Sequence, residues 1–383
     1  MKYNRPRIKS VYPIYRLNDE TFRIGAQIGI TKEFNDPTHQ LWVLVNLLDG
    51  RPIEDVLKQE KAAFPDLNLS DDYIIDGIDL LSKEELIEEA MPEKEKNFDK
   101  RYLSNITYFS RFNDENGDRF KPQRIINNST ILLLGLGGGG ANILTLLAGL
   151  GPKKIIIIDY DVVEQKNLGR QLLYRESDIG KPKVEVAARV LKEMNSNIEV
   201  EAHNQKINTA DDITKHLSGV DLVISAIDEP QFIIQRIVNK AIVKANVPCV
   251  FGGTQVSRGR VFTIIPGVTG CFDCLSIHYT LIDPEFVQQF IGFMESDFNP
   301  DSIAYGPAIF QLTSAVVDEA VRVLTNYADP HSLSNQFEIN YEDYSSYSHD
   351  AWPRFPDKCP TCGLGSEDDW EVFKYMPITI NEH

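Results

Sequence analysis

The segment TILLLGLGGGGANILTLLAGLGPKKIIIIDYDVVEQKNLGRQ, residues 130–171, carries the strongest structural pattern of the chain. A short apolar strand, Ile131–Leu134, leads into a glycine-dense turn and then into apolar residues at helical spacing over Ala141–Leu150. Glycines reach positive φ angles and leave room for a phosphate above the unpaired N–H groups of a helix N-terminus. A second strand, Lys154–Ile158, ends at Asp159, about 20 residues past the glycines, where dinucleotide folds place a ribose-binding acid. The segment therefore predicts a nucleotide-binding βαβ unit.

The polar residues after this unit favour a triphosphate over a nicotinamide cofactor. A glycine turn alone is also typical of dehydrogenases, which need only an acid for the ribose. This chain adds a further acid, amides, an arginine and a lysine: Asp161, Asn167, Gln171, Arg170 and Lys183. Cations and amides close to two acids suit ATP and its magnesium ion.

The ordered set of motifs is more specific than any one of them. The chain contains GxGGxG, then DxDxVExxNLxRQ, then GxxK, and later Ser225-Ala-Ile-Asp228. This set resembles the signature of the ThiF/MoeB superfamily, the adenylating domains related to ubiquitin-activating enzymes. Within it, the chain is most similar to the microcin C type of peptide nucleotidyltransferase, which carries an N-terminal peptide-clamp domain. The resemblance extends over residues 101–365 and covers residues 1–90 only in outline.

The resemblance implies a role for each matching residue. The glycine turn would hold the phosphates of ATP, Asp159 its ribose, and Asp228 the Mg²⁺ ion and the α-phosphate. The amides, Arg170 and Lys183 would contact the β- and γ-phosphates. An N-cap role for Asp228 and the use of CTP stay open at this point. The predicted nucleotide-binding set is Gly135, Gly137, Gly138, Gly140, Asp159, Asp161, Asn167, Arg170, Gln171, Lys183 and Asp228, of which Arg170, Lys183 and Asp228 are the catalytic candidates.

The bulk composition is that of an ordinary globular protein. The 383 residues are 42% hydrophobic and 25% charged, which is sufficient for two domains with substantial cores. A net charge of −17 argues against nucleic acid or an anionic membrane as a partner, because both would repel the chain. The N-terminus lacks an apolar signal region, and no apolar run approaches the ~18 residues of a membrane span. We therefore expect a cytoplasmic protein.

Residues 1–95 predict a small winged-helix-like domain. In peptide-modifying enzymes such a unit resembles a clamp that receives a leader peptide as an added strand. A dimerisation or packing domain is the alternative, and acidic pairs such as Glu84-Glu85 argue against a nucleic-acid-binding one. The expected elements are strands Val11–Arg16 and Thr21–Ile24 and helical segments Gln40–Leu48, Ile53–Glu60 and Asp71–Glu89, with Ile74, Ile75, Ile78, Leu80, Leu81 and Leu86 buried.

A charged segment, residues 91–100, is expected to link this domain to an adenylation domain over residues 101–365, followed by a tail over 366–383. In the superfamily that this chain resembles, the second domain starts with the motif Arg-Tyr-x-Arg. The second arginine of this motif contacts the ATP that is bound to the partner subunit. A homodimer is therefore expected. This chain has Ser104 at that position, and two alternatives stay open: Arg101 or Arg111 substitutes for the missing arginine, or the phosphates have fewer contacts.

The remainder of the second domain alternates between strand and helix. The helix Val184–Met194 is followed by strands Ile198–Ala202, Asp221–Ala226 and Val247–Gly252. Such alternation predicts an α/β fold, a Rossmann-like doubly wound parallel sheet with ligands at the carboxyl ends of its strands.

The cysteines form two C-x₂-C pairs, Cys271/Cys274 and Cys359/Cys362. This spacing lets one turn give two thiolates to a tetrahedral zinc ion, so a structural Zn²⁺ site is predicted. Disulfides are the less favoured alternative in a reducing compartment. Cys249, in an apolar strand, is expected to be a buried small hydrophobe. The histidines show no HxxH or HExxH pairing and receive no predicted role.

The function predicted from these residues is ATP-dependent adenylation of a ribosomally made precursor peptide that carries a leader segment. Two alternatives remain: adenylation of a sulfur-carrier or ubiquitin-like C-terminus, and a non-catalytic subunit that recruits a leader peptide, for which Ser104 is the main support. The segment Leu275–Leu324 contains no cysteine, so no thioester with the enzyme is expected.

Overall fold

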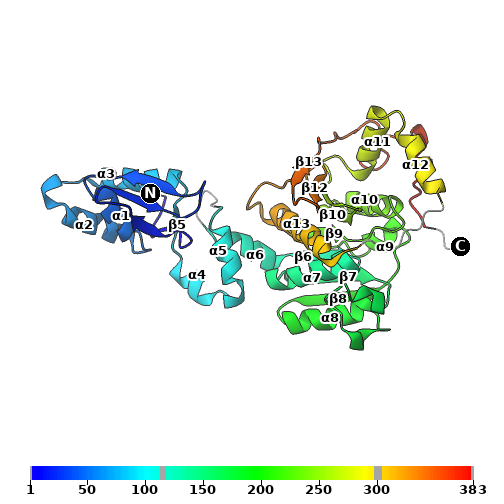
Figure 1. Cartoon of the computed structure of the whole chain (residues 1–383), viewed down its shortest axis with the longest axis horizontal. Helices are drawn as coiled ribbons and strands as arrows, with labels where there is room; N and C mark the ends of the chain where they lie inside the picture. Colours follow the sequence, from blue (N-terminus) through cyan, green and yellow to red (C-terminus); the bar gives the residue numbers. More distant parts are fainter. Residues whose placement is uncertain (1, 113–117, 297–303, 381–383) are drawn as a thin grey trace. The chain divides into compact units, whose positions relative to one another are not determined.

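The computed structural model describes residues 2–112, 118–296 and 304–380, and the chain divides into two compact units, residues 1–124 and 125–383 (Figure 1). The first unit extends past the predicted boundary because Ile106 packs with Tyr102 and Phe120 in a small cluster of its own. Among the described residues, each helix is too short or too polar to cross a lipid bilayer.

The first unit combines helices with two small antiparallel sheets, of order β2-β3-β4 and β1-β5. Strands β1 and β4 were not predicted, and the expected helix Asp71–Glu89 ends at Lys83 and is followed by β5. The charged segment 91–100 contains helix α4 rather than an irregular linker, since Pro92 suits a first helical turn. The elements are β1 (Pro6–Ile8), β2 (Ile14–Arg16), β3 (Thr21–Ile24), β4 (Lys32–Asn35), α1 (Gln40–Leu47), α2 (Ile53–Ala63), α3 (Asp71–Lys83), β5 (Ile87–Glu89), α4 (Pro92–Asn97), α5 (Leu103–Phe109) and α6 (Lys121–Asn128), the last of which runs into the second unit.

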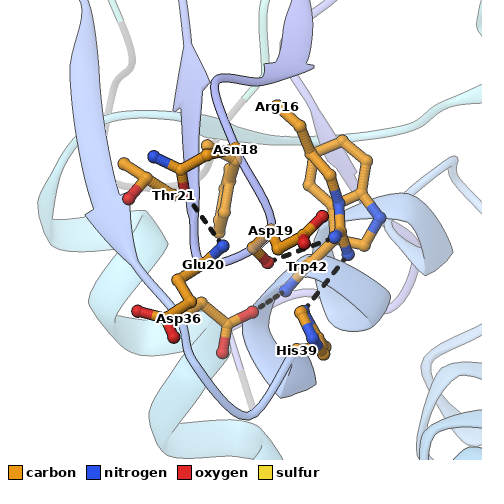
Figure 2. A pocket seen from close by; sticks show the side chains of 9 residues that line it. Arg16, Asn18, Asp19, Glu20, Thr21, Asp36, His39 and Trp42 are labelled. Atoms are coloured by element: carbon orange, nitrogen blue, oxygen red, sulfur yellow. Dashed lines mark hydrogen bonds between the residues drawn. The ribbon is translucent and has the colours of Figure 1, made fainter.

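The core of the first unit lies between α1, α2, α3 and the strands. Ile74, Ile78 and Leu81 point one face of α3 into this core, as predicted. Leu80 was predicted to be buried but is 44% exposed, because it lies off the face of these three residues. Near the β2–β3 turn, the Arg16 guanidinium lies 4.6 Å from the Trp42 ring centre, at the edge of a shallow pocket that also includes His39 (Figure 2).

The second unit is built on one mixed sheet of order β13-β12-β11-β10-β9-β6-β7-β8 (Figure 1). The strands from β10 to β8 run parallel, and their order is that of a Rossmann fold. The prediction of a parallel sheet is wrong for β11, β12 and β13, which pair antiparallel. Only residues 255–257 separate β10 from β11, and so short a turn permits a hairpin but no parallel crossover.

Helices cover both faces of this sheet, so it is doubly wound. Helices α7, α8 and α13 pack on one face, and α9, α10 and α11 on the other. The elements are β6 (Thr130–Leu134), α7 (Gly138–Leu150), β7 (Lys154–Asp159), α8 (Lys183–Met194), β8 (Glu199–Asn204), α9 (Ala210–Thr214), β9 (Leu222–Ser225), α10 (Ile233–Ala245), β10 (Cys249–Thr254), β11 (Arg258–Ile264), α11 (Phe272–Ile282), α12 (Phe286–Glu295), α13 (Gly306–Thr325), β12 (Phe337–Asn340) and β13 (Ser346–Ser348).

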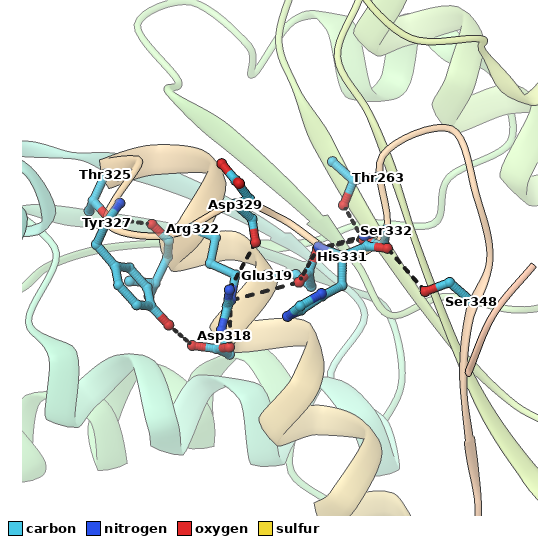
Figure 3. A network of polar contacts seen from close by, with 11 residues as sticks. Thr263, Asp318, Glu319, Arg322, Thr325, Tyr327, Asp329, His331, Ser332 and Ser348 are labelled. Carbon is cyan, nitrogen blue, oxygen red and sulfur yellow. Dashed lines mark hydrogen bonds and ion pairs between the residues drawn. The ribbon is translucent and has the colours of Figure 1, made fainter. Parts of the chain in front are cut away.

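A buried carboxylate ties the end of α13 to the sheet (Figure 3). Glu319 is 2% exposed and accepts hydrogen bonds from the backbone N–H groups of His331 and Ser332 and from the Ser332 hydroxyl, at 2.7–3.0 Å. The Ser332 hydroxyl also lies 2.8 Å from that of Thr263 on β11. This network holds the segment after α13 against β11.

Candidate active site

Two glycines allow the turn after β6 to contact the turn after β9. Gly135 has φ +87°, and a Cβ there would lie 2.6 Å from Ile227 Cγ2 and 2.8 Å from the Ala226 carbonyl oxygen. A Cβ at Gly140 would lie 1.9 Å from the Gly135 carbonyl oxygen, so a side chain is excluded. Strands β6 and β9 are neighbours in the sheet although β7 and β8 separate them in sequence. This is the switch point where open α/β sheets bind ligands.

The N-terminus of α7 lies at this switch point and has free space above it. A Cβ at Gly137 would meet no atom within 4 Å, so space remains above the first turn. A Cβ at Gly138 would meet Cδ and Nε of Arg170 at 3.5 Å, so this side chain crosses the helix N-terminus. Its guanidinium donates to the Lys166 carbonyl at 3.1 Å. Unpaired helix N–H groups beside a guanidinium suit a polyphosphate.

Asp159 and Asp161 follow β7 at this edge. Asp159 accepts from the backbone N–H of Leu136 at 2.6 Å and from that of Asp161 at 2.7 Å. Burial raises the pKa of the Asp159 carboxyl, while these two hydrogen bonds and the Lys183 charge act in the opposite direction. Each bonded oxygen keeps a second lone pair for a ribose hydroxyl.

Lys183 is held at the edge by Asp161. The residue is 4% exposed, and its Nζ lies 2.8 Å from Asp161 Oδ2. An ammonium has three donors, so this ion pair leaves hydrogens for a phosphate.

The side chains of the two amide residues predicted to bind phosphate, Asn167 and Gln171, are buried. Asn167 Oδ1 accepts from the Glu164 backbone N–H at 2.9 Å and so caps a 3₁₀ turn. Gln171 is 2% exposed, and within the described residues its Oε1 has no hydrogen-bond partner. A buried amide oxygen of this kind normally bonds to a ligand or to water.

Asp228 lies just past the end of β9. It is not a helix N-cap, because α10 begins at Ile233 and Phe232 occupies the cap position. Although water reaches the residue, the surrounding protein desolvates the carboxyl and raises its pKa, and the negative charge of Glu229 adds to this shift. We call the residues of the glycine turn, Asp159, Asp161, Arg170, Lys183 and Asp228 the nucleotide edge.

A charged group on the neighbouring strands was not predicted from the sequence. Arg258 and Arg260 on β11 form ion pairs with Glu338 on β12, at 3.2 and 2.6 Å. Tyr347 and both arginines lower the pKa of Glu338 to about 2 against the opposing effect of burial. Gly259, between the two arginines, pairs with Thr254 at the end of β10. The pairing of β10 with β9 ends earlier, at Phe251. The charged group therefore lies at the carboxyl end of these parallel strands, as the nucleotide edge does. The only sequence signal for this group was the pair of alternating arginines, Arg258 and Arg260, at the start of the apolar segment that forms β11.

The two C-x₂-C pairs meet in space. Sγ atoms lie 3.8 Å apart for Cys271/Cys274, 3.5 Å for Cys271/Cys359 and 3.4 Å for Cys274/Cys362, and all four lie within 4.8 Å of one another. Zn–S bonds of ~2.3 Å place tetrahedral sulfurs roughly 3.8 Å apart. Burial raises the pKa of Cys271, so four adjacent thiolates would require a cation. The geometry fits the predicted structural zinc site.

A buried ion pair lies beside the cysteine cluster and helps to hold the C-terminal segment against the domain. The Arg236 and Asp273 side chains are both 0% exposed and approach to 3.1 Å. Asp273 also accepts from the Thr361 hydroxyl at 2.7 Å, and Arg236 donates to the Met376 carbonyl. Residues 372–376 enter the core, so the predicted tail is a packed part of the domain. We call the four cysteines with Arg236 and Asp273 the tail anchor.

The remaining cysteine behaves as predicted. Cys249 is 0% exposed, and burial raises its pKa well above the usual value. The cysteine-free segment forms α11, α12 and α13 over the residues described, while residues 297–303 lie outside them.

The fold and the nucleotide edge define a nucleotide-binding α/β protein of Rossmann type. The chain belongs to the ThiF family, whose model matches residues 102–361. It is 38% identical over 154 residues to the NEDD8-activating enzyme E1 catalytic subunit of Saccharomyces cerevisiae, covering 38% of this chain and 50% of that protein. It is 29% identical over 248 residues to the sulfur carrier protein ThiS adenylyltransferase of Bacillus subtilis, covering 63% of this chain and 67% of that one.

Two solved structures of MccB match almost the whole chain. One is E. coli MccB with ATP, and the other is the microcin C7 biosynthetic enzyme MccB in complex with N-formylated MccA. Each matches with a TM-score of 0.74 and 23% identity, covering 94% of this chain and 99% of the other. At this identity the likeness establishes the fold.

Proposed function

We propose that this protein adenylates a carboxylate or amide oxygen of a ribosomally made precursor peptide, using ATP. The observation that carries the proposal is the position of Arg170 across the N-terminus of α7, with Lys183 held by Asp161 at the same edge. Two cations beside a glycine turn suit ATP, whose β- and γ-phosphates leave as pyrophosphate.

In the reaction we propose, a carboxylate or amide oxygen of the peptide forms a bond to the α-phosphorus of ATP. The bond from this phosphorus to the bridging oxygen breaks, and pyrophosphate carries the electron pair away. Arg170, Lys183 and the N–H groups of α7 stabilise the charge that develops on the leaving group. Catalysis is mainly positioning and charge neutralisation, so no side-chain nucleophile is needed.

Magnesium would be held by Asp228, which is followed in the chain by a second acid, Glu229. Carboxylates together with substrate phosphates are the usual ligands of Mg²⁺, which neutralises phosphate charge when bound. The cysteines of the tail anchor would hold a structural Zn²⁺, since four thiolates leave no position open for water.

The first unit would bind the leader segment of the peptide. Strands β2 and β4 are the two edges of its three-stranded sheet, and an edge can accept an added peptide strand. The pocket beside Trp42 and His39 could receive a side chain of that strand. The likeness to MccB, solved with N-formylated MccA, supports a peptide over a folded partner.

A sulfur-carrier protein is the second candidate substrate, and the similarity to the ThiS adenylyltransferase favours it. Transfer of the adenylate to an enzyme thiol is not proposed, because Cys249 is fully buried and the other cysteines belong to the tail anchor. A homodimer also remains a proposal. A third candidate function is a subunit that recruits the leader peptide without turning over ATP, because Ser104 replaces the family arginine.

The test is isotope exchange between pyrophosphate and ATP. The full chain is assayed with Mg²⁺ and either the peptides encoded beside its gene or a carrier protein that ends in Gly-Gly, with CTP in parallel. Exchange that depends on a peptide is the expected result. Exchange with the carrier alone would replace the peptide by the second candidate, and peptide binding without any exchange would overturn the assignment of an enzyme.

A further inference from the structure

Two histidines and a glutamate meet near the β8 edge of the second unit. Glu201 and His203 are two positions apart on β8 and therefore project from the same face of the sheet. His203 Nε2 lies 2.7 Å from Glu201 Oε1, and the ring centres of His203 and His216 are 4.1 Å apart. One ligand atom of each residue lies within 4.8 Å of the other two. Three good metal ligands thus share one small volume.

Neighbouring residues orient these three side chains. Lys154 Nζ lies 2.6 Å from Glu201 Oε2, which leaves Oε1 directed at His203. The Gln205 side-chain oxygen lies 3.3 Å from His216 Nε2 and can accept only its N–H, so Nδ1 keeps a free lone pair. Hydrogen bonds of this kind fix the tautomer and the ring direction of metal-binding histidines.

The ligands are accessible and suited to a metal. The side chains of His203 and Glu201 are 29% and 39% exposed, so an ion can enter from solvent.

We propose that Glu201, His203 and His216 bind one divalent transition-metal ion, with Zn²⁺ as the best-fitting example. Two imidazoles and a carboxylate form an established zinc ligand set that leaves a fourth position for water. Zn–N and Zn–O bonds of ~2.0–2.2 Å require ligand atoms roughly 3.3 Å apart, so shifts of about 1 Å close the site. Mg²⁺ and Ca²⁺ prefer oxygen ligands and fit less well.

The site is separate from the tail anchor but close to the nucleotide edge. In the sheet, His203 pairs with Ile158 and Asn204 with Asp159. The Gln205 N–H donates to the Asp159 carbonyl at 3.2 Å. A metal titration therefore has to omit ATP, which would itself bring metal to this region.

The test is a calorimetric titration of the full chain, purified with its anchor zinc, with ZnCl₂ at about pH 7.5 and without nucleotide. We expect one additional equivalent of zinc in the wild type. His203→Gln and His216→Gln should each weaken this binding by about 10-fold or more. The matched control is His349→Gln, because His349 forms a histidine–glutamate pair with Glu338 at 3.2 Å that, among the described residues, belongs to no group of three metal ligands.

Absence of the additional equivalent, or equal affinity in the wild type and both histidine variants, would overturn the proposal. Thermal melts establish that each variant is folded. If one variant unfolds, Glu201→Gln provides the same test, because it keeps the size of the side chain and removes the anionic ligand, although it also breaks the ion pair with Lys154.

Discussion

The nucleotide edge and the tail anchor belong to the same unit and differ in how their polar groups are paired. At the edge, Asp228 is an exposed residue, and the amide oxygen of Gln171, which follows Arg170 in the chain, has no partner within the described residues. At the anchor, Arg236 and Asp273 are fully buried and bonded to each other and to the C-terminal segment. The anchor pairs its buried charges within the chain and needs only a structural metal ion for its thiolates, whereas the edge has polar groups that we expect a nucleotide to pair. Changes at the anchor should therefore affect stability, and changes at the edge should affect turnover.

The largest effect is expected from Cys362→Ser. It removes one of four thiolates, so the single zinc ion per chain should be lost, and Tm should fall by roughly 10 °C or more. Elemental analysis and a thermal melt measure both quantities. The control Cys249→Ala should keep its zinc. A Cys362→Ser protein that melts like the wild type would remove the distinction between the two regions.

The next effect is that of Arg236→Met, which leaves Asp273 charged and buried without its partner. Removing one side of such a pair costs about 3–5 kcal/mol, whereas replacing both sides by apolar residues is often neutral. Denaturant unfolding should show this loss for Arg236→Met and recovery for Arg236→Met combined with Asp273→Leu. Lys244→Met is the matched control on the same helix, because its ion pair with Asp211 is exposed, and it should change stability by less than about 1 kcal/mol.

The smallest effect in free energy, but the most selective one, is expected from Asp228→Asn. If this carboxylate serves magnesium and the α-phosphate, pyrophosphate exchange should fall by about 10²- to 10³-fold while Tm stays unchanged. Glu229→Gln, the adjacent acid, should keep most of the activity. Wild-type exchange in Asp228→Asn would show that the edge does not use this residue.

Local patterns were sufficient to predict much of the second unit. The β6–α7–β7 unit follows from apolar periodicity and the glycines, and the C-x₂-C spacing identified four cysteines that do meet. The motif order also indicated that the glycine turn and Asp228 both follow strands, and these strands, β6 and β9, are neighbours in the sheet; the role of Asp228 stays a prediction.

Contacts between distant residues could not be predicted in this way. Arg236 and Asp273 carry no joint pattern, since the sequence contains many charged residues and only packing shows which two are buried together. His203 and His216 belong to different elements, so a search for HxxH spacing missed them. The antiparallel β11–β13 edge was missed because β12 and β13 are short and partly polar, and because β11 follows β10 after only residues 255–257.

The hydrogen bond from Arg236 to the Met376 carbonyl spans 140 positions of the chain. During synthesis on a ribosome, α10 emerges long before the segment that contains Met376. Until that segment arrives, Arg236 lacks a carbonyl partner and Cys271 and Cys274 lack their two counterparts. We therefore expect incomplete chains to leave a charge and two thiols unpaired, a difference from full-length molecules that proteases and chaperones can use.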